Sequence, residues 1–164
     1  MAIKDALLPE FDHEMGTTRR LLERVPEDKL DWQPHKKSMT LGRLATHVAE
    51  IPHWAQTVIK DSVFTMEPDQ FQPKTFGSRA ELLKSFDDNV AAARALVAPL
   101  TDAEFMATWT MRSGGHDVLS MPKAAVFRSF VMSHLIHHRG QLSVYLRENN
   151  VPLPPIYGPS ADEK

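Results

Sequence analysis

Two histidines in the last third of the chain, His134 and His138, stand four residues apart. On a helix that turns by about 100° per residue, this spacing places both side chains on one face, about 40° apart. Two imidazoles in that arrangement can chelate one divalent metal ion. Paired histidines also occur by chance in helices, so the spacing needs support from other parts of the chain.

Both histidines lie on the apolar stripe of a predicted long helix. This helix has Pro122 in its first turn and ends near Asn149. An imidazole in such a stripe costs about 1 to 3 kcal/mol of desolvation unless a metal ion or hydrogen bonds satisfy it. The stripe consists of Phe127, Phe130, Val131, His134, His138, Gln141, Leu142 and Tyr145.

A third histidine, His47, borders the apolar stripe of an earlier predicted helix, which Ser38 or Thr40 can cap. Facing helices in a bundle lie about 8 to 10 Å apart, and side chains from both can bridge this gap to one ion. Three neutral imidazoles suit zinc, nickel, copper, iron or manganese to different degrees and leave coordination positions open, as catalysis requires. This second stripe consists of Leu41, Leu44, Val48, Ile51, Ala55 and Val58.

The histidine between the two proposed ligands of the last helix has a different direction. His137 directly precedes His138 and points about 100° away from it on a helix. We therefore expect it to pack against other residues or to support a metal ligand. The alternative chelating pair is His134 with His137.

Other residues near these histidines each allow two interpretations. Gln141, one turn after His138, can hydrogen-bond a ligand, contact a substrate or serve as a buried structural amide. Glu50 can orient His47 or act as a base, or it can be a solvated charge. Gly140 permits close approach of a neighbouring helix or chain. We expect surface or capping roles for His13, His35, His53 and His116, and packing roles for Trp32, Trp54 and Trp109.

The elements that must position these side chains are predicted from apolar periodicity and from proline and capping residues. Pro52 lies within the second helical pattern and predicts a kink or an early end of that helix. Ser78 and Thr101 each begin a capping-box pattern. Long helices are predicted over residues 8–25, 41–58, 79–98 and 122–149, with a short helical turn after 101.

Three further segments are predicted to be non-helical. Residues 62–77 contain two prolines and are predicted to form a long irregular connection. Residues 109–119 alternate around Gly114 and Gly115, which favours a small hairpin. Residues 151–159 are too rich in proline to be helical and should run extended over the surface.

Composition limits the class of protein. A length of 164 residues suits one domain, so we expect residues 1–164 to form a single domain. The net charge of -2 gives no electrostatic reason to expect a nucleic-acid or anionic-membrane partner. No segment resembles a membrane span or a signal peptide, so a cytoplasmic location is expected. Because there is no cysteine, disulfides, thiolate zinc sites and a cysteine nucleophile are excluded.

Three segments together carry a family resemblance. Residues 38–50, which include His47, residues 134–147, which include both later histidines, and residues 154–158 resemble the DinB/YfiT-like superfamily over nearly the whole chain. The resemblance implies an all-α four-helix bundle, commonly a homodimer. It also implies a metal ion bound by one histidine of the second helix and an H-x-x-x-H pair of the fourth. These positions are His47, His134 and His138.

The resemblance also suggests classes of reaction. Characterised members include S-transferases that use low-molecular-weight thiols, and metal-dependent hydrolases or isomerases. We therefore expect a metal-dependent enzyme acting on a small-molecule substrate, with zinc or nickel as the ion, iron or manganese as alternatives, and an external thiol if the reaction is S-transfer. The alternative is a noncatalytic metal-binding or stress-response bundle. A fourth protein ligand would favour the noncatalytic bundle, and open positions facing a cavity would favour catalysis.

Overall fold

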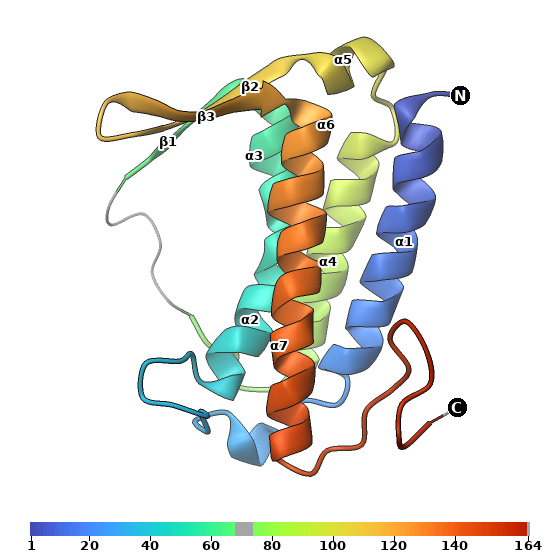
Figure 1. The fold of residues 1–164 in the computed structure, drawn as a ribbon, viewed down its shortest axis with the longest axis vertical. Coiled ribbons are helices and arrows are strands. Elements are labelled where there is room, and N and C mark those ends of the chain that lie inside the picture. The colour runs from blue at the N-terminus through green and yellow to red at the C-terminus, as the bar shows by residue number, and fades with distance from the viewer. Residues whose placement is uncertain (68–73, 164) are drawn as a thin grey trace.

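The computed structural model of the chain describes residues 1–67 and 74–163. Helical segments run side by side through the length of the molecule, and a small sheet lies at one end of them (Figure 1). Among the helices of the described residues, none combines the length and the apolar character needed to cross a membrane.

The first helix, α1 (Ile3–Leu22), starts five residues before the predicted residue 8 and contains Pro9. Its first turn is stabilised by two side chains that accept backbone N–H groups at 2.8 Å. One of them, Asp5, is local, whereas Asp102 comes from a distant part of the chain. The early start therefore depends on a long-range contact.

The second and third long segments begin where their capping residues predict. The hydroxyl of Thr40 accepts a first-turn N–H of α2 (Leu41–Glu50) at 3.2 Å. Ser78 does the same at 3.2 Å for α4 (Arg79–Val97). The short helix α5 (Asp102–Met106) follows the second capping box.

Pro52 interrupts the second segment, at the predicted place. α2 ends at Glu50, and a turn of 3-10 helix (Ile51–His53) contains the proline. The chain then continues as α3 (Trp54–Lys60). The first part, α2, carries His47.

The last helical segment is continuous but changes its type. Pro122 ends a strand and caps α6 (Lys123–Val126), so it lies just before the helix and not in its first turn. A π-helical stretch (Phe127–Ser133) follows and leads into α7 (His134–Glu148). Such stretches insert an extra residue into a helix and are frequent beside functional sites. Both C-terminal candidate ligands lie on α7, directly after this stretch.

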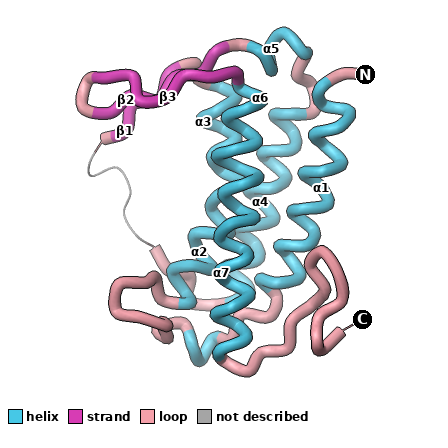
Figure 2. The backbone as a smooth tube through the Cα atoms, viewed as in Figure 1, coloured by secondary structure: helices cyan, strands magenta, loops and turns pink. Residues whose placement is uncertain are grey.

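The predicted all-α class is wrong, because the structure contains a three-stranded mixed sheet (Figure 2). The expected hairpin is present as β2 (Thr108–Ser113) and β3 (His116–Pro122), joined by Gly114 and Gly115 at positive φ. The strand β1 (Val63–Met66) lies in the segment predicted to be irregular and pairs in parallel with β2. Of its four residues only Phe64 is half-buried, so the strand has no clear apolar alternation. Residues 68–73 of that predicted connection lie outside the described part of the chain.

The apolar stripe predicted for the second helix lies in the core, but the stripe predicted for the last helix is only partly buried. Every residue of the stripe on α2 and α3 is buried. On α7 the buried residues are Leu135, Arg139, Leu142 and Leu146, whereas His134, His138 and Tyr145 of the predicted stripe are half-buried and Gln141 is exposed. Trp109 is fully buried, and Trp32 packs edge-on against Tyr145 with ring centroids 5.4 Å apart, in agreement with packing roles. The histidines expected on the surface, His13, His35, His53 and His116, are all exposed.

Candidate metal centre

Three histidines meet where α2 and α7 pack against each other. His47 comes from α2, and His134 and His138 come from successive turns of α7. One ligand atom from each residue lies within 4.8 Å of the other two. The Nε2 atoms of His47 and His134 are 3.2 Å apart, and the rings of His47 and His138 have centroids 4.5 Å apart. The structure thus brings together the three residues predicted as ligands.

This spacing fits a shared metal ion. Two nitrogens bound at about 2.0 to 2.1 Å to a tetrahedral zinc ion lie about 3.3 Å apart. A direct hydrogen bond between His47 and His134 would give a similar distance, but it would satisfy only those two side chains. Among the described residues, Nε2 of His138 has no hydrogen-bond partner. One ion in this place would satisfy all three imidazoles.

Gln141 fixes the orientation of one ligand. Its Oε1 atom lies 2.7 Å from Nδ1 of His138. When Nδ1 carries the proton and donates it to this oxygen, the lone pair of Nε2 is available to a metal. Gln141 is exposed, so it is not the buried structural amide of the alternative interpretation.

His137 is not part of the cluster of three. Its side chain is exposed, and its ring packs edge-on against His138 with centroids 4.8 Å apart. The geometry therefore favours His134 with His138 over the alternative pair of His134 with His137.

Burial keeps the three imidazoles uncharged. Burial, and then the charges of neighbouring side chains, lower the pKa of His47 from 6.5 to about 4. Burial also lowers the pKa of His134 and of His138. At neutral pH the three side chains are therefore in the deprotonated form that binds a metal ion.

Two opposite charges flank His47 on α2. Arg43 lies one turn before it and Glu50 one turn after it, with Nη1 of the arginine 3.5 Å from Oε2 of the glutamate. The positive charge of Arg43 contributes to the lowered pKa of His47 and of His138. Glu50 faces the arginine, and no hydrogen bond joins it to His47 within the described residues.

A second polar cluster, not predicted from the sequence, lies on another side of α7 and contains the buried residues Arg139 and Glu14. Arg139 is 1% exposed and pairs with Glu14 of α1 at 2.7 Å. Its Nη2 atom donates to the Tyr157 hydroxyl at 2.6 Å, and this hydroxyl donates to Glu14 at 3.0 Å. Burial, and then the bond to Glu14, raise the pKa of Tyr157, so it stays a donor. The burial of Glu14 could have been predicted from the sequence, because Glu14 shares one helical face with Phe11 and Thr18, which are both buried.

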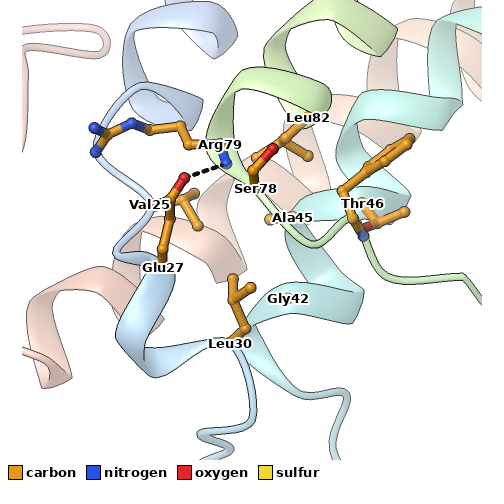
Figure 3. Close-up of a pocket in the computed structure, with 10 residues that line it drawn as sticks. Val25, Glu27, Leu30, Gly42, Ala45, Thr46, Ser78, Arg79 and Leu82 are labelled. Atoms are coloured by element: carbon orange, nitrogen blue, oxygen red, sulfur yellow. Dashed lines mark hydrogen bonds between the residues drawn. The ribbon is translucent and has the colours of Figure 1, made fainter.

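The pocket in Figure 3 is separate from the histidine cluster. None of the three histidines lines it, and from α2 it receives Gly42, Ala45 and Thr46. A Cβ atom on Gly42 would lie 2.7 Å from Cγ2 of Thr75 and 3.1 Å from the carbonyl oxygen of Leu30, so a larger residue would require these neighbours to move. Thr46 accepts the N–H of Phe76 at 3.1 Å. These contacts hold α2 in place, and among the described residues no group of candidate metal ligands lines the pocket.

Comparison with known proteins gives consistent matches over the whole chain. The model of the DinB family matches residues 1–164. The uncharacterized proteins YrdA and YjoA of Bacillus subtilis are 26% and 24% identical; the alignments cover 97% and 96% of this chain and 90% and 97% of theirs. Crystal structures of DinB-like proteins from Bacillus cereus and Bacillus subtilis (YjoA) superpose with TM-scores of 0.71 at 22% and 23% identity. They cover 95% and 93% of this chain and 98% of theirs.

Proposed function

Starting from the fact that the chain belongs to the DinB family, we propose that it is a metal-dependent enzyme. In this proposal His47, His134 and His138 hold one divalent ion. The observation that carries it is a group of three imidazoles whose ligand atoms lie within 4.8 Å of one another. No histidine, aspartate or glutamate among the other described residues joins this group. Structural zinc sites have four protein ligands, whereas catalytic sites have three and an open position.

The donor set also limits the ion and the reaction. Imidazoles suit zinc and nickel, with iron and manganese as alternatives. A bound divalent ion would lower the pKa of a thiol or of water in its open position. The chain has no cysteine, so the sulfur of an S-transfer reaction would come from a low-molecular-weight thiol. We propose S-transfer to an electrophilic small molecule, with hydrolysis as the alternative reaction.

The chain's own residues have distinct roles in this proposal. His47 and His134 provide ligands from two helices, and their neutral state at pH 7 removes competition from protons. Gln141 holds His138 with its Nε2 lone pair free.

Metal analysis of protein purified without added ions tests the site. The wild type and His137→Ala should each bind about one ion, and His47→Ala, His134→Ala and His138→Ala should each lose it. His137→Ala is a matched control because it removes an exposed histidine of the same helix. Equal metal content in all variants would contradict the assignment.

Turnover of the loaded protein tests the reaction. Zinc- and nickel-loaded samples would be assayed with 1-chloro-2,4-dinitrobenzene as the electrophile and cysteine, glutathione or coenzyme A as the thiol. Conjugation that requires the metal and each of the three histidines would support S-transfer. Activity that survives the loss of all three ligands would overturn the metal-dependent mechanism. A bound ion without turnover would favour a noncatalytic metal-binding bundle.

A further inference from the structure

Arg43 is a half-buried cation beside the candidate metal centre. Its Nη1 atom is buried and makes no hydrogen bond within the described residues. The nearest carboxylate oxygen, on Glu50, is 3.5 Å away, beyond the usual range of about 2.7 to 3.2 Å for an N–H donor. An unsatisfied buried donor opposes folding, so its presence requires an explanation.

Arg43 lies next to the candidate metal centre along α2, so its unpaired donor concerns the site as well as the fold. It lies four residues before His47, on the same face of α2. A positive charge at this place repels a divalent cation held by the histidines. An anion that contacts both the guanidinium and the ion would remove this repulsion and satisfy the free donor.

We propose that Arg43 is a substrate-positioning residue that binds the carboxylate of a small molecule whose other end faces the histidine cluster. The inference rests on the proposed metal-dependent function and names its substrate class. A guanidinium binds a planar carboxylate through parallel N–H donors. The carboxylate of Glu50 nearby disfavours a doubly charged phosphate more than it disfavours a single carboxylate.

A pair of matched thiols tests this inference with cobalt(II)-loaded protein, in which a bound thiolate changes the visible absorption of the ion. The two probes, 3-mercaptopropionate and 3-mercapto-1-propanol, differ mainly in the charge of the group at the end distant from sulfur. The wild type should bind 3-mercaptopropionate about 10- to 100-fold more tightly. Arg43→Gln should lose this preference and bind the same amount of cobalt, and Arg43→Lys should retain part of it.

Two further variants separate positioning from structure. Arg79→Gln removes an equal charge at the pocket of Figure 3 and should leave the preference unchanged. Glu50→Gln should increase the preference, because it releases Arg43 from its only nearby carboxylate among the described residues. Equal binding of both thiols by the wild type, or a preference that persists in Arg43→Gln, would overturn the inference alone. A wild type that binds no cobalt would overturn the proposed metal site and the inference with it.

Discussion

His138 and Arg139 are neighbours on α7, yet the polar clusters around them differ in one respect. Around Arg139 the charged groups satisfy each other, because its guanidinium contacts Glu14 at 2.7 Å and Tyr157 at 2.6 Å. Around His138 the Nε2 atom has no partner in the described chain, and Arg43 nearby has a free donor. A cluster that satisfies itself holds the chain together, whereas one with unused donors and lone pairs is suited to a ligand.

One helix can serve both clusters because adjacent residues point about 100° apart. His138 faces α2, and Arg139 faces α1 and the C-terminal segment that carries Tyr157. We call the group of Arg139, Glu14 and Tyr157 the closed cluster. It fixes the rotation of α7, and this rotation determines where His134 and His138 point. Four changes test this division, and the closed cluster should give the largest effect.

Arg139→Met would break the closed cluster. Glu14, which is 6% exposed, would be left as a buried charge without its partner. The free energy of unfolding should fall by about 3 to 5 kcal/mol, measured by urea denaturation. The double variant Glu14→Leu with Arg139→Met should lie closer to the wild type, because neither charge then remains buried alone. A loss below about 1 kcal/mol in the single variant would contradict the structural role.

Gln141→Ala would loosen the open cluster, which consists of His47, His134 and His138. Removal of the oxygen that holds Nδ1 of His138 should weaken zinc binding about 10- to 100-fold in calorimetric titrations. Stability without metal should change little, because Gln141 is exposed. Gln56→Ala is the control, because Gln56 lies 3.1 Å from the exposed His53 in the same three-residue spacing. Equal affinities in both variants would mean that Gln141 does not orient the ligand.

The stability of the metal-free protein should depend on pH in a defined window. The pKa of His47 is about 4 in the folded chain and about 6.5 in the unfolded chain, so the unfolded chain binds more protons between these values. Its contribution to stability is complete above pH 6.5 and is lost as the pH falls towards 4. Each such histidine adds a slope of at most about 1.4 kcal/mol per pH unit.

Denaturation of the metal-free protein at several pH values measures this effect. His47→Ala should flatten the slope, and replacement of the exposed His53 should leave it unchanged. A slope of opposite sign would show that the histidine cluster is stabilised by protonation.

The smallest effect is expected from Gly140→Ala on the exposed side of α7. A Cβ atom there meets nothing within 4 Å, so the change should stabilise the helix by about 1 kcal/mol. Gly42→Ala should instead destabilise the fold, because its Cβ would lie 2.7 Å from the Thr75 side chain and 3.1 Å from Leu30. Melting temperatures and sedimentation at several concentrations would be compared. If a second copy of the chain packs against Gly140, as the expected homodimer allows, the variant should weaken association.

The histidine site could be predicted because its signal is local. His134 and His138 share one helical face, and His47 borders the stripe of a helix whose cap and apolar spacing are visible in the sequence. The family resemblance then joined the two helices. The stripe predicted over residues 41–58 is buried, whereas on α7 the buried face (Leu135, Arg139, Leu142 and Leu146) lies beside the predicted stripe, which places the histidines at the edge of the core.

The remaining features depend on contacts between distant segments. β1 has four residues and little burial, and it is a strand because it pairs with β2. The early start of α1 uses the carboxylate of Asp102. The Arg139 cluster joins α1, α7 and the C-terminal segment, so no short stretch of sequence contains it. Helical periodicity can indicate that Glu14 is buried, but it cannot identify a partner in a distant segment.

The crystal structure of the zinc-loaded protein, with zinc located by its anomalous scattering, tests the central claim most directly. The account predicts one ion at about 2.0 to 2.1 Å from a nitrogen of each of His47, His134 and His138, with at least one coordination position open to solvent. An ion bound elsewhere, or one whose coordination is completed by a fourth protein side chain, would contradict it.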